Sequence, residues 1–256
     1  MRRMKEVADS DGAVEAGRLF VVATPIGNLG DTTPRSIEIL RSVDAIAAED
    51  TRRTRKLLTH FGITTRQIPY HDHNEERASR EVVERIEAGE DIALVSDAGT
   101  PLVADPGYRL VSSCAERGLE VIAVPGPSAV VAALSIAGLP PQPFHFAGYL
   151  PRKSGQRRSK LASLAGLSCT VVYYESPHRI AAALKDMHEV LGDRKAVVAR
   201  ELTKVHEEVL RGTLGELSAM AESRRLKGEI VVVVGCPGKD GGRGGTIREE
   251  VDTSLL

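Results

Sequence analysis

The chain has 256 residues, a formal net charge of −1 and 42% hydrophobic residues. This length suits one large or two modest domains with enough core to fold without disulfides. The balanced charge gives no overall indication of a nucleic-acid or membrane partner. Aromatic residues make up only 4%, with no Trp, which disfavours recognition based mainly on base stacking.

The cysteines and the chain ends indicate a cytoplasmic protein with reduced thiols and with unstructured termini. Cys114, Cys169 and Cys236 are far apart and odd in number, which is typical of reduced thiols in a cytoplasmic protein rather than of a disulfide framework or a zinc site. No apolar stretch approaches the roughly 18 residues of a membrane span. Residues 1–17 lack the apolar core of a signal peptide and predict a disordered extension. Residues 239–256 predict a flexible tail.

The first half of the chain alternates short apolar runs with amphipathic stretches. The apolar runs predict strands at residues 19–24, 44–48, 66–70, 91–96 and 120–124. Between and after them the pattern predicts helices that start at Pro34, Thr51, Glu75, Asp105 and Ser128. Thr33 and Asn74 are the expected caps of two of these helices. Such alternation predicts an α/β domain over residues 18–140 with a largely parallel sheet.

The pattern changes after the proline-rich residues 139–143, which predict a linker. Strands are expected beyond it at residues 144–149, 169–174, 196–200, 207–211 and 229–235. Helices are expected at residues 155–164, 177–191 and 214–224, the second of them capped by Ser176. These elements predict a second α/β or α+β domain over residues 141–238.

Glycine- and proline-rich segments follow three strands of the first domain, at residues 25–31, 97–101 and 125–129. Ligands of parallel sheets bind beyond the carboxyl ends of the strands. A glycine there lets a ligand approach the backbone, and the Asp97 carboxylate can accept hydrogen bonds from ribose hydroxyls or an amino group. Each segment alone is also compatible with an ordinary polar turn. The three together favour a cofactor site, and the absence of Walker A and GxGxxG patterns disfavours a nucleoside triphosphate or a dinucleotide.

Two basic segments stand out against the balanced charge of the whole chain. Four cations near one helix start oppose the helix dipole, which suggests either a phosphate partner or a solvated face balanced by Glu49 and Asp50. Residues 121–174 contain no Asp or Glu, but they include several cations. A polyanion partner is favoured there over a solubilising surface. The candidate RNA-binding residues are Arg52, Arg53, Arg55, Lys56, Arg152, Lys153, Arg157 and Arg158.

A polar cluster, His71-Asp72-His73-Asn74-Glu75, follows the third strand. Neighbouring residues of a loop point in different directions, so their spacing is poor for joint metal ligation. The cluster therefore indicates an acid/base role, a hydrogen-bonding role or simply a helix cap, and no metal site is expected.

Five motifs in order carry a resemblance to a known family. They are residues 23–31 (ATPIGNLGD), 49–52 (EDTR), 96–101 (SDAGTP), 124–129 (VPGPSA) and 174–179 (YESPHR). Together they resemble the ribosomal RNA small subunit methyltransferases of the tetrapyrrole methylase-like superfamily, over residues 18–238. The first loop departs from the GxGxGD pattern common in that superfamily, which weakens a tetrapyrrole assignment.

The resemblance implies two α/β domains with S-adenosylmethionine in the cleft between them, in a cytoplasmic homodimer. It implies transfer of a methyl group to the ribose 2′-hydroxyl of a decoding-centre cytidine in 16S rRNA. The residues that it places beside the cofactor are Pro25, Gly27, Asp97, Ala98, Gly99, Pro101, Ser128, Ala129, Leu150 and Glu175.

Methyl transfer from a sulfonium requires chiefly position and a proton acceptor, because a ribose hydroxyl is a poor nucleophile until its proton is removed. His73, Glu75 and Glu201 are the candidate bases, and the sequence does not rank them. Two alternatives stay open. One is a tetrapyrrole or protein methyltransferase of the same superfamily, and the other is a non-catalytic RNA-binding assembly protein, which the glycines of the predicted cleft disfavour.

Overall fold

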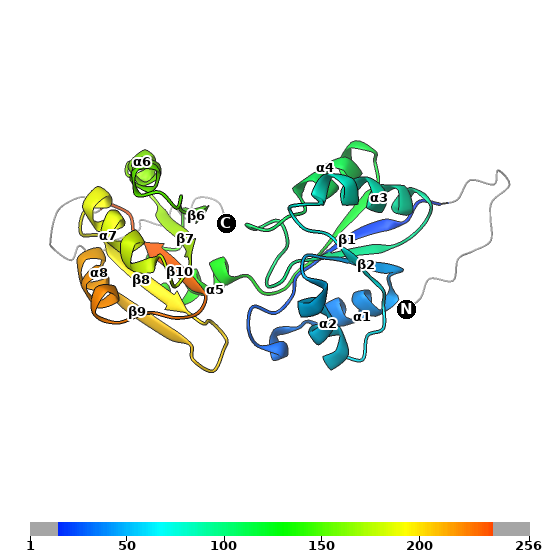
Figure 1. Ribbon diagram of the computed structural model, residues 1–256, viewed down its shortest axis with the longest axis horizontal. Coiled ribbons are helices and arrows are strands. Elements are labelled where there is room, and N and C mark those ends of the chain that lie inside the picture. The colour runs from blue at the N-terminus through cyan, green and yellow to red at the C-terminus, as the bar shows by residue number, and fades with distance from the viewer. Residues whose placement is uncertain (1–14, 238–256) are drawn as a thin grey trace, which may run out of the picture.

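The computed structural model describes residues 15–237, which form two α/β units, each built on a five-stranded sheet (Figure 1). The expected two-domain α/β architecture is confirmed. The predicted tail at residues 239–256 lies outside the described residues, as does all but residues 15–17 of the predicted N-terminal extension. Within residues 15–237, no helix combines the length and the apolar character needed to cross a membrane.

The first unit has the regular strand–helix alternation that its sequence predicts. Its elements are β1 (Arg18–Val22), η1 (Leu29–Asp31), α1 (Pro34–Ser42), β2 (Ala45–Ala48), α2 (Thr51–His60), β3 (Gln67–Pro69), α3 (Glu75–Glu87), β4 (Ile92–Val95), α4 (Tyr108–Glu116) and β5 (Glu120–Val124). The strand order is β3-β2-β4-β1-β5, and all neighbours are parallel, as expected.

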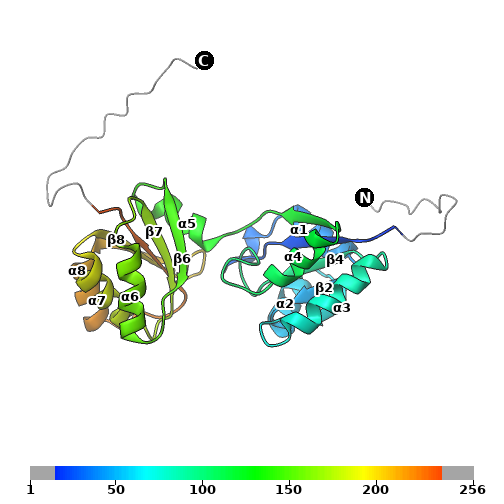
Figure 2. The ribbon, with the colours of Figure 1, turned by 90° about the horizontal axis from the view of Figure 1, so that it is seen from above.

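Successive strand residues of this sheet point to opposite faces, so each face has its own core. Leu19 and Ile92 pack under α3 and α4, whereas their neighbours Phe20 and Ala93 pack against α1 and α2. Figures 1 and 2 show the two helix layers on either side of the sheet. Because both faces are covered, ligands can reach the sheet only at its ends.

The second unit mixes parallel and antiparallel pairing. Its elements are α5 (Ala129–Ala137), β6 (Phe144–Tyr149), α6 (Ser154–Leu164), β7 (Thr170–Glu175), α7 (Ile180–Leu191), β8 (Lys195–Arg200), β9 (Glu208–Thr213), α8 (Leu214–Ser223) and β10 (Ile230–Val234). The strand order is β6-β7-β10-β8-β9, in which β6 and β7 are parallel and the other pairs are antiparallel. Helices α6, α7 and α8 cover one face of this sheet and α5 covers the other.

The chain crosses between the units earlier than the sequence analysis places the boundary. Val130 and Leu134 of α5 pack on Val197 and Val231 of the second sheet. The crossing therefore lies between β5 and α5, and the proline-rich linker expected at residues 139–143 is a connection inside the second unit. Small apolar residues fill α5, so it can lie close to a sheet on either side, and its sequence does not say which one.

The predicted cap of α1 is confirmed, because Thr33 Oγ1 accepts a hydrogen bond from Ser36 N at 3.1 Å. The predicted capping bond of Asn74 is wrong. Its side chain instead accepts from His71 N at 2.8 Å and donates to the Pro69 carbonyl at 3.0 Å, which closes the turn before α3.

Two predicted helix starts are also corrected. Helix α7 begins at Ile180, so Ser176 belongs to the preceding turn and is not its cap. Helix α4 begins at Tyr108 rather than at Asp105. Leu102 and Ala104 have φ angles of 70° and 72°, which no right-handed helix contains. Backbone strain of this kind persists only where the surrounding structure holds it.

Candidate active site

Hydrogen bonds join the loops that follow β1, β4 and β5. The backbones of Thr24 and Gly99 exchange hydrogen bonds of 2.9 and 3.0 Å, and Thr24 Oγ1 donates to the Ser96 carbonyl. Thr100 Oγ1 donates to the Pro127 carbonyl at 3.2 Å. The expectation that these three loops meet at one sheet edge is confirmed. Gly99 has a φ of +84°, a conformation that favours glycine.

A cavity of about 300 Å³ opens at this edge, between the two units. This volume lies at the lower end of the range of small-molecule sites. Residues from both units line it, so the expected interdomain cleft is present. The predicted cofactor residues among its walls are Asp97, Ala98, Gly99, Ser128, Ala129 and Glu175.

Four predicted cofactor residues do not line the cavity: Pro25, Gly27, Pro101 and Leu150. Leu150 is 2% exposed in the core of the second unit. Gly27 lies against the β8–β9 loop, where an added Cβ would come within 2.9 Å of the Leu202 carbonyl oxygen. The close contact between the two units therefore accounts for a glycine at position 27 without any ligand.

Backbone N–H donors and one arginine hold the carboxylates of the first unit in place at the cleft. Asp97 Oδ1 accepts a hydrogen bond from Asp50 N at 3.0 Å, and Oδ2 lies 3.2 Å from Arg53 Nη1. Glu49 Oε2 accepts from Asp97 N at 3.3 Å. Burial raises the pKa of Glu49, and the negative charge of Asp97 adds to the shift. Arg53, which the sequence assigns to RNA, therefore also forms a wall of the cavity.

Asp105 is a cleft residue that sequence reasoning missed. It follows the two left-handed residues before α4 and lines the cavity. Burial raises its pKa to about 6, with a further contribution from the negative charge of Glu49, whereas a hydrogen bond from Ser96 lowers it. Its sequence context, Asp-Pro, is also a common helix start, so no local signal distinguishes the two roles.

Glu175 supplies a carboxylate from the end of β7 in the second unit. Its side chain is fully buried, and it accepts from Ser176 N at 2.7 Å and from Arg179 Nη2 at 3.2 Å. Burial raises the Glu175 pKa, and both partners oppose the shift. Glu175 therefore lines the cavity, while its carboxylate is held by Ser176 and Arg179 and has no surface accessible to solvent.

Two tyrosines of the second unit complete the cleft. Tyr149 and Tyr174 line the cavity with ring centroids 5.6 Å apart, and Tyr149 is 58% exposed. Phe146 packs against Tyr174 from the other side at 4.8 Å. Burial raises the pKa of Tyr174 to about 12, so its hydroxyl stays protonated at neutral pH. Tyr149 and Tyr174 thus offer aromatic surface where a flat ligand could stack.

None of the three candidate bases lines the cavity. Glu75 Oε1 accepts from Gly107 N at 3.0 Å and from Tyr70 OH at 3.3 Å, so it anchors the start of α4. Glu201 accepts from Glu229 N and from Lys204, and these bonds lower its pKa. His73 lies in a separate shallow depression on the first unit.

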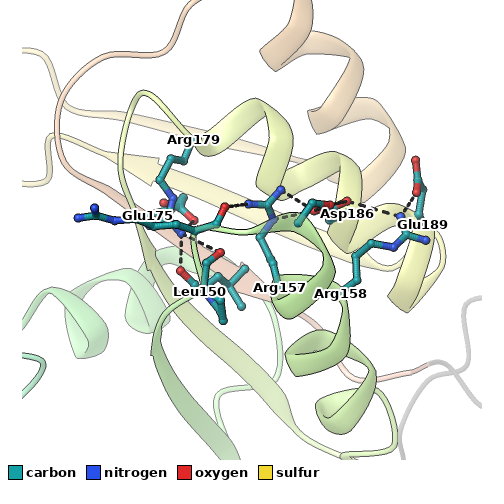
Figure 3. Close-up of polar contacts among 10 residues, drawn as sticks. Leu150, Arg157, Arg158, Glu175, Arg179, Asp186 and Glu189 are labelled. Carbon is teal, nitrogen blue, oxygen red and sulfur yellow. Dashed lines mark hydrogen bonds and ion pairs between the residues drawn. The ribbon is translucent and has the colours of Figure 1, made fainter.

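Two cations of the basic stretch, Arg157 and Arg158, are neutralised by a helix that lies far away in the sequence. Arg157 is buried, and its Nε donates to Asp186 Oδ2 of α7 at 2.7 Å. Arg158 pairs with Glu189 of the same helix, as Figure 3 shows. The absence of Asp and Glu from residues 121–174 predicted a polyanion partner for these cations. This inference is corrected for Arg157 and Arg158, because acidic side chains of α7 lie beside them in the folded chain.

The structure consequently removes Arg157 from the candidate RNA-binding residues, because its side chain is only 6% exposed. Arg152 and Lys153, just before α6, are exposed. On α2, Arg55 and Lys56 are exposed, and Arg52 is exposed while it pairs with Asp50, the cap of its own helix. Within residues 15–237, no group of three or more His, Cys, Asp or Glu side chains is arranged to hold a metal ion.

Comparisons with known proteins agree with this architecture. Residues 18–218 match the family model of the tetrapyrrole (corrin/porphyrin) methylases. A crystal structure of diphthine synthase superposes with a TM-score of 0.66 at 17% identity, covering 86% of this chain and 90% of that one. The cobalamin biosynthetic enzyme cobalt precorrin-4 methyltransferase gives 0.63 at 17%, covering 85% and 94%. The fold and the cleft thus define a methyltransferase of the tetrapyrrole methylase type.

Closer relatives narrow the family. Ribosomal RNA small subunit methyltransferase I of Vibrio cholerae serotype O1 is 51% identical over 219 residues, 84% of this chain and 76% of that protein. The protein of the same name from Synechocystis sp. is 52% identical over 85% of this chain and 78% of its own length. That of Escherichia coli O157:H7 is 47% identical over 90% and 81%. The chain belongs to this ribosomal RNA small subunit methyltransferase I family.

Proposed function

We propose that the protein transfers a methyl group from S-adenosylmethionine to a ribose 2′-hydroxyl of 16S rRNA, at a cytidine of the decoding centre. The observation that carries the proposal is the cleft at the β4 end, where Asp97 and Gly99 face the second unit, in a chain about half identical to proteins named for small-subunit rRNA methylation. We also propose the small ribosomal subunit as the substrate, a homodimeric assembly and a cytoplasmic location.

The residues of the cleft fit an S-adenosyl cofactor. Ile26, Val103 and Val231 offer apolar surface for an adenine ring. The Asp97 carboxylate, whose side chain is partly exposed, can accept hydrogen bonds from ribose hydroxyls or from an ammonium group. The cofactor, when bound, supplies an electrophilic methyl group. The protein has to position the two reactants, exclude water and accept one proton.

The RNA backbone would reach the cleft along exposed cations. Arg152 and Lys153 follow the cleft residue Tyr149 within a few positions, and Arg55 and Lys56 extend α2 beyond Arg53, which lines the cavity. Phosphate contacts of this kind position an RNA without reading its sequence. The base of the target nucleotide would then meet the aromatic side chains of the second unit.

A methyl-transfer assay tests the function. Purified protein and radiolabelled S-adenosylmethionine are incubated with small ribosomal subunits from a strain that lacks the corresponding enzyme. Label should appear at one cytidine, at the ribose rather than the base, as nuclease digestion and mass spectrometry of the nucleosides will show. Label on a tetrapyrrole or on a protein, or RNA binding without transfer, would reject the proposal in favour of the alternative that the product identifies.

Replacing Asp97 with Ala should weaken S-adenosylmethionine binding at least tenfold. Hydrogen bonds to a charged group contribute about 1.5–3 kcal/mol, which corresponds to roughly a 10- to 150-fold change in the dissociation constant. Isothermal titration calorimetry measures the change, and Glu84→Ala at an exposed position of α3 is the control. An unchanged affinity in Asp97→Ala would remove Asp97 from the cofactor site.

Reversing Arg152 and Lys153 to Glu should weaken RNA binding by about 10- to 100-fold at moderate salt and leave cofactor affinity unchanged. Both side chains are exposed, so the effect is electrostatic and should shrink as salt increases. Fluorescence anisotropy over a salt series gives the slope. Arg35→Glu with Lys185→Glu, also exposed, makes the same change in net charge elsewhere. Equal losses in both double variants would show that only overall charge matters.

A further inference from the structure

We propose that Asp105 is the catalytic base, whose carboxylate removes the proton from the ribose hydroxyl as the methyl group is transferred. The inference rests on the proposed function and assigns a role in it to a residue outside the recognised motifs. It replaces His73, Glu75 and Glu201, none of which lines the cleft.

The other carboxylates of the cleft are already engaged. Asp97 is paired with Arg53, and Glu49 accepts from the Asp97 backbone. Glu175 is held by Arg179, and Glu229 lies 3.0 Å from Lys204 Nζ. Among the salt bridges formed by residues 15–237, none includes Asp105. Glu49 is also outside these salt bridges, but its Oε2 accepts from Asp97 N, so within that range Asp105 is the cleft carboxylate with neither an ion pair nor a backbone donor.

The groups around Asp105 suit a base that works near neutral pH. Burial raises the Asp105 pKa to about 6, the negative charges of Glu49, Asp97 and Asp72 add to the shift, and a hydrogen bond from Ser96 opposes it. From the second unit, the hydroxyls of Tyr149 and Tyr174 lie across the cleft, both with raised pKa values. General bases act best when their pKa lies close to the operating pH.

The backbone holds Asp105 in one position. Leu102 and Ala104 adopt left-handed φ angles just before it, and Gly107 just after it has a φ of 135°. Gly107 N donates to the partly buried Glu75 carboxylate at 3.0 Å. Strained backbone of this kind is typical of functional segments. Glu75 is thus a positioning residue: it fixes the segment and does not touch the reactants.

The step balances with the groups named. The 2′-oxygen forms a bond to the methyl carbon, and the carbon–sulfur bond breaks with its electron pair going to sulfur. The proton of the 2′-hydroxyl goes to a carboxylate oxygen of Asp105. Solvent then takes the proton from Asp105 when the products leave, which restores the carboxylate.

Single-turnover methyl transfer with the full-length protein, saturating S-adenosylmethionine and small subunits tests the assignment. Asp105→Asn should slow transfer at pH 7.5 by at least 100-fold, while the dissociation constants of cofactor and RNA change less than threefold. Asp105→Glu should retain part of the rate. Glu84→Gln, an exposed carboxylate on α3, should behave as wild type.

The pH profile separates a catalytic role from a structural one. Because the carboxylate is the active form, the wild-type rate should rise through about pH 6 and level off above it. Asp72→Asn removes the weakest of the three like charges that raise the Asp105 pKa, so it should move this rise slightly to lower pH and keep the plateau. In Asp105→Asn the rise should disappear from the residual rate.

Three results would overturn the assignment. If Asp105→Asn transfers within threefold of an active wild type, Asp105 is not the base, and the proposed function stands. If Asp105→Asn keeps the wild-type pH rise, another group titrates. If the wild-type protein itself transfers no methyl group to RNA, both the function and the assignment fail.

Discussion

Replacing Asp186 with Ala should lower the free energy of unfolding by about 3–5 kcal/mol. Its carboxylate accepts from Arg157 Nε at 2.7 Å and from Ser154 Oγ at 3.0 Å, and both members of the ion pair are nearly inaccessible to water. Without the carboxylate, a buried guanidinium keeps its charge and loses its partner. The cost comes from that uncompensated charge more than from the lost attraction.

The neighbouring pair offers a matched control. Arg158 and Glu189 join the same two helices, but their side chains are 43% and 42% exposed. Glu189→Ala should therefore cost about 0–1 kcal/mol. Urea denaturation followed by circular dichroism, with each transition fitted separately, measures both. Similar losses in the two variants would contradict the argument from burial.

Replacing Gly107 with Ala should cost roughly 2–4 kcal/mol. A Cβ at this position would lie 2.8 Å from Leu94 Cδ2 and 3.1 Å from Leu102 Cδ1, in a core that cannot expand freely. The φ of 135° adds strain for any residue with a side chain. The same substitution should slow methyl transfer, because it displaces the segment that carries Asp105.

Gly118→Ala measures the strain of an ordinary left-handed residue without close contacts, whereas Gly107, with φ 135° and ψ −18°, lies outside that region and adds strain of its own. Gly118 also has a positive φ, +69°, but an added Cβ there meets no atom within 4 Å. It should cost about 1 kcal/mol, which is the conformational strain alone. Thermal unfolding of the two variants gives the difference. If Gly118→Ala is as damaging as Gly107→Ala, the contacts with Leu94 and Leu102 are not the main cause.

The sequence predicted most of the fold because local patterns determine most of it. Apolar runs and amphipathic stretches located the strands and helices, and the strand-end rule brought together the loops around Thr24, Gly99 and Pro127. The placement of α5 was not predictable, because its uniformly small, apolar surface can pack on either sheet. The start of α4 was not predictable either, since Asp105-Pro106 is equally typical of a helix start.

The site was predicted in part, because some of its residues follow from the strand order and others depend on contacts between distant segments. Motif residues such as Asp97 and Glu175 lie at the carboxyl ends of strands, so their place at the cleft follows from topology. The partners of Arg157 and Arg158 lie about 30 residues away on α7, and no sequence window contains both sides of these pairs. The position of Asp105 depends on the left-handed residues Leu102 and Ala104 and on the hydrogen bond from Gly107 N to Glu75. Both features arise only in the folded chain.

The crowding of carboxylates in the cleft has a consequence for turnover. Among the residues that the structure describes, five carboxylates, of Glu49, Asp97, Asp105, Glu175 and Glu229, line one small cavity beside a single cation, Arg53. The excess of negative charge favours a positively charged guest over a neutral one. A sulfonium carries such a charge, and the thioether left after the reaction does not. The same field that attracts the reactant should therefore hold the spent cofactor less tightly, which favours its exchange. The same negative field repels phosphates. The RNA backbone should therefore stay at the exposed cations Arg55, Lys56, Arg152 and Lys153, and only the target nucleotide should enter the cavity.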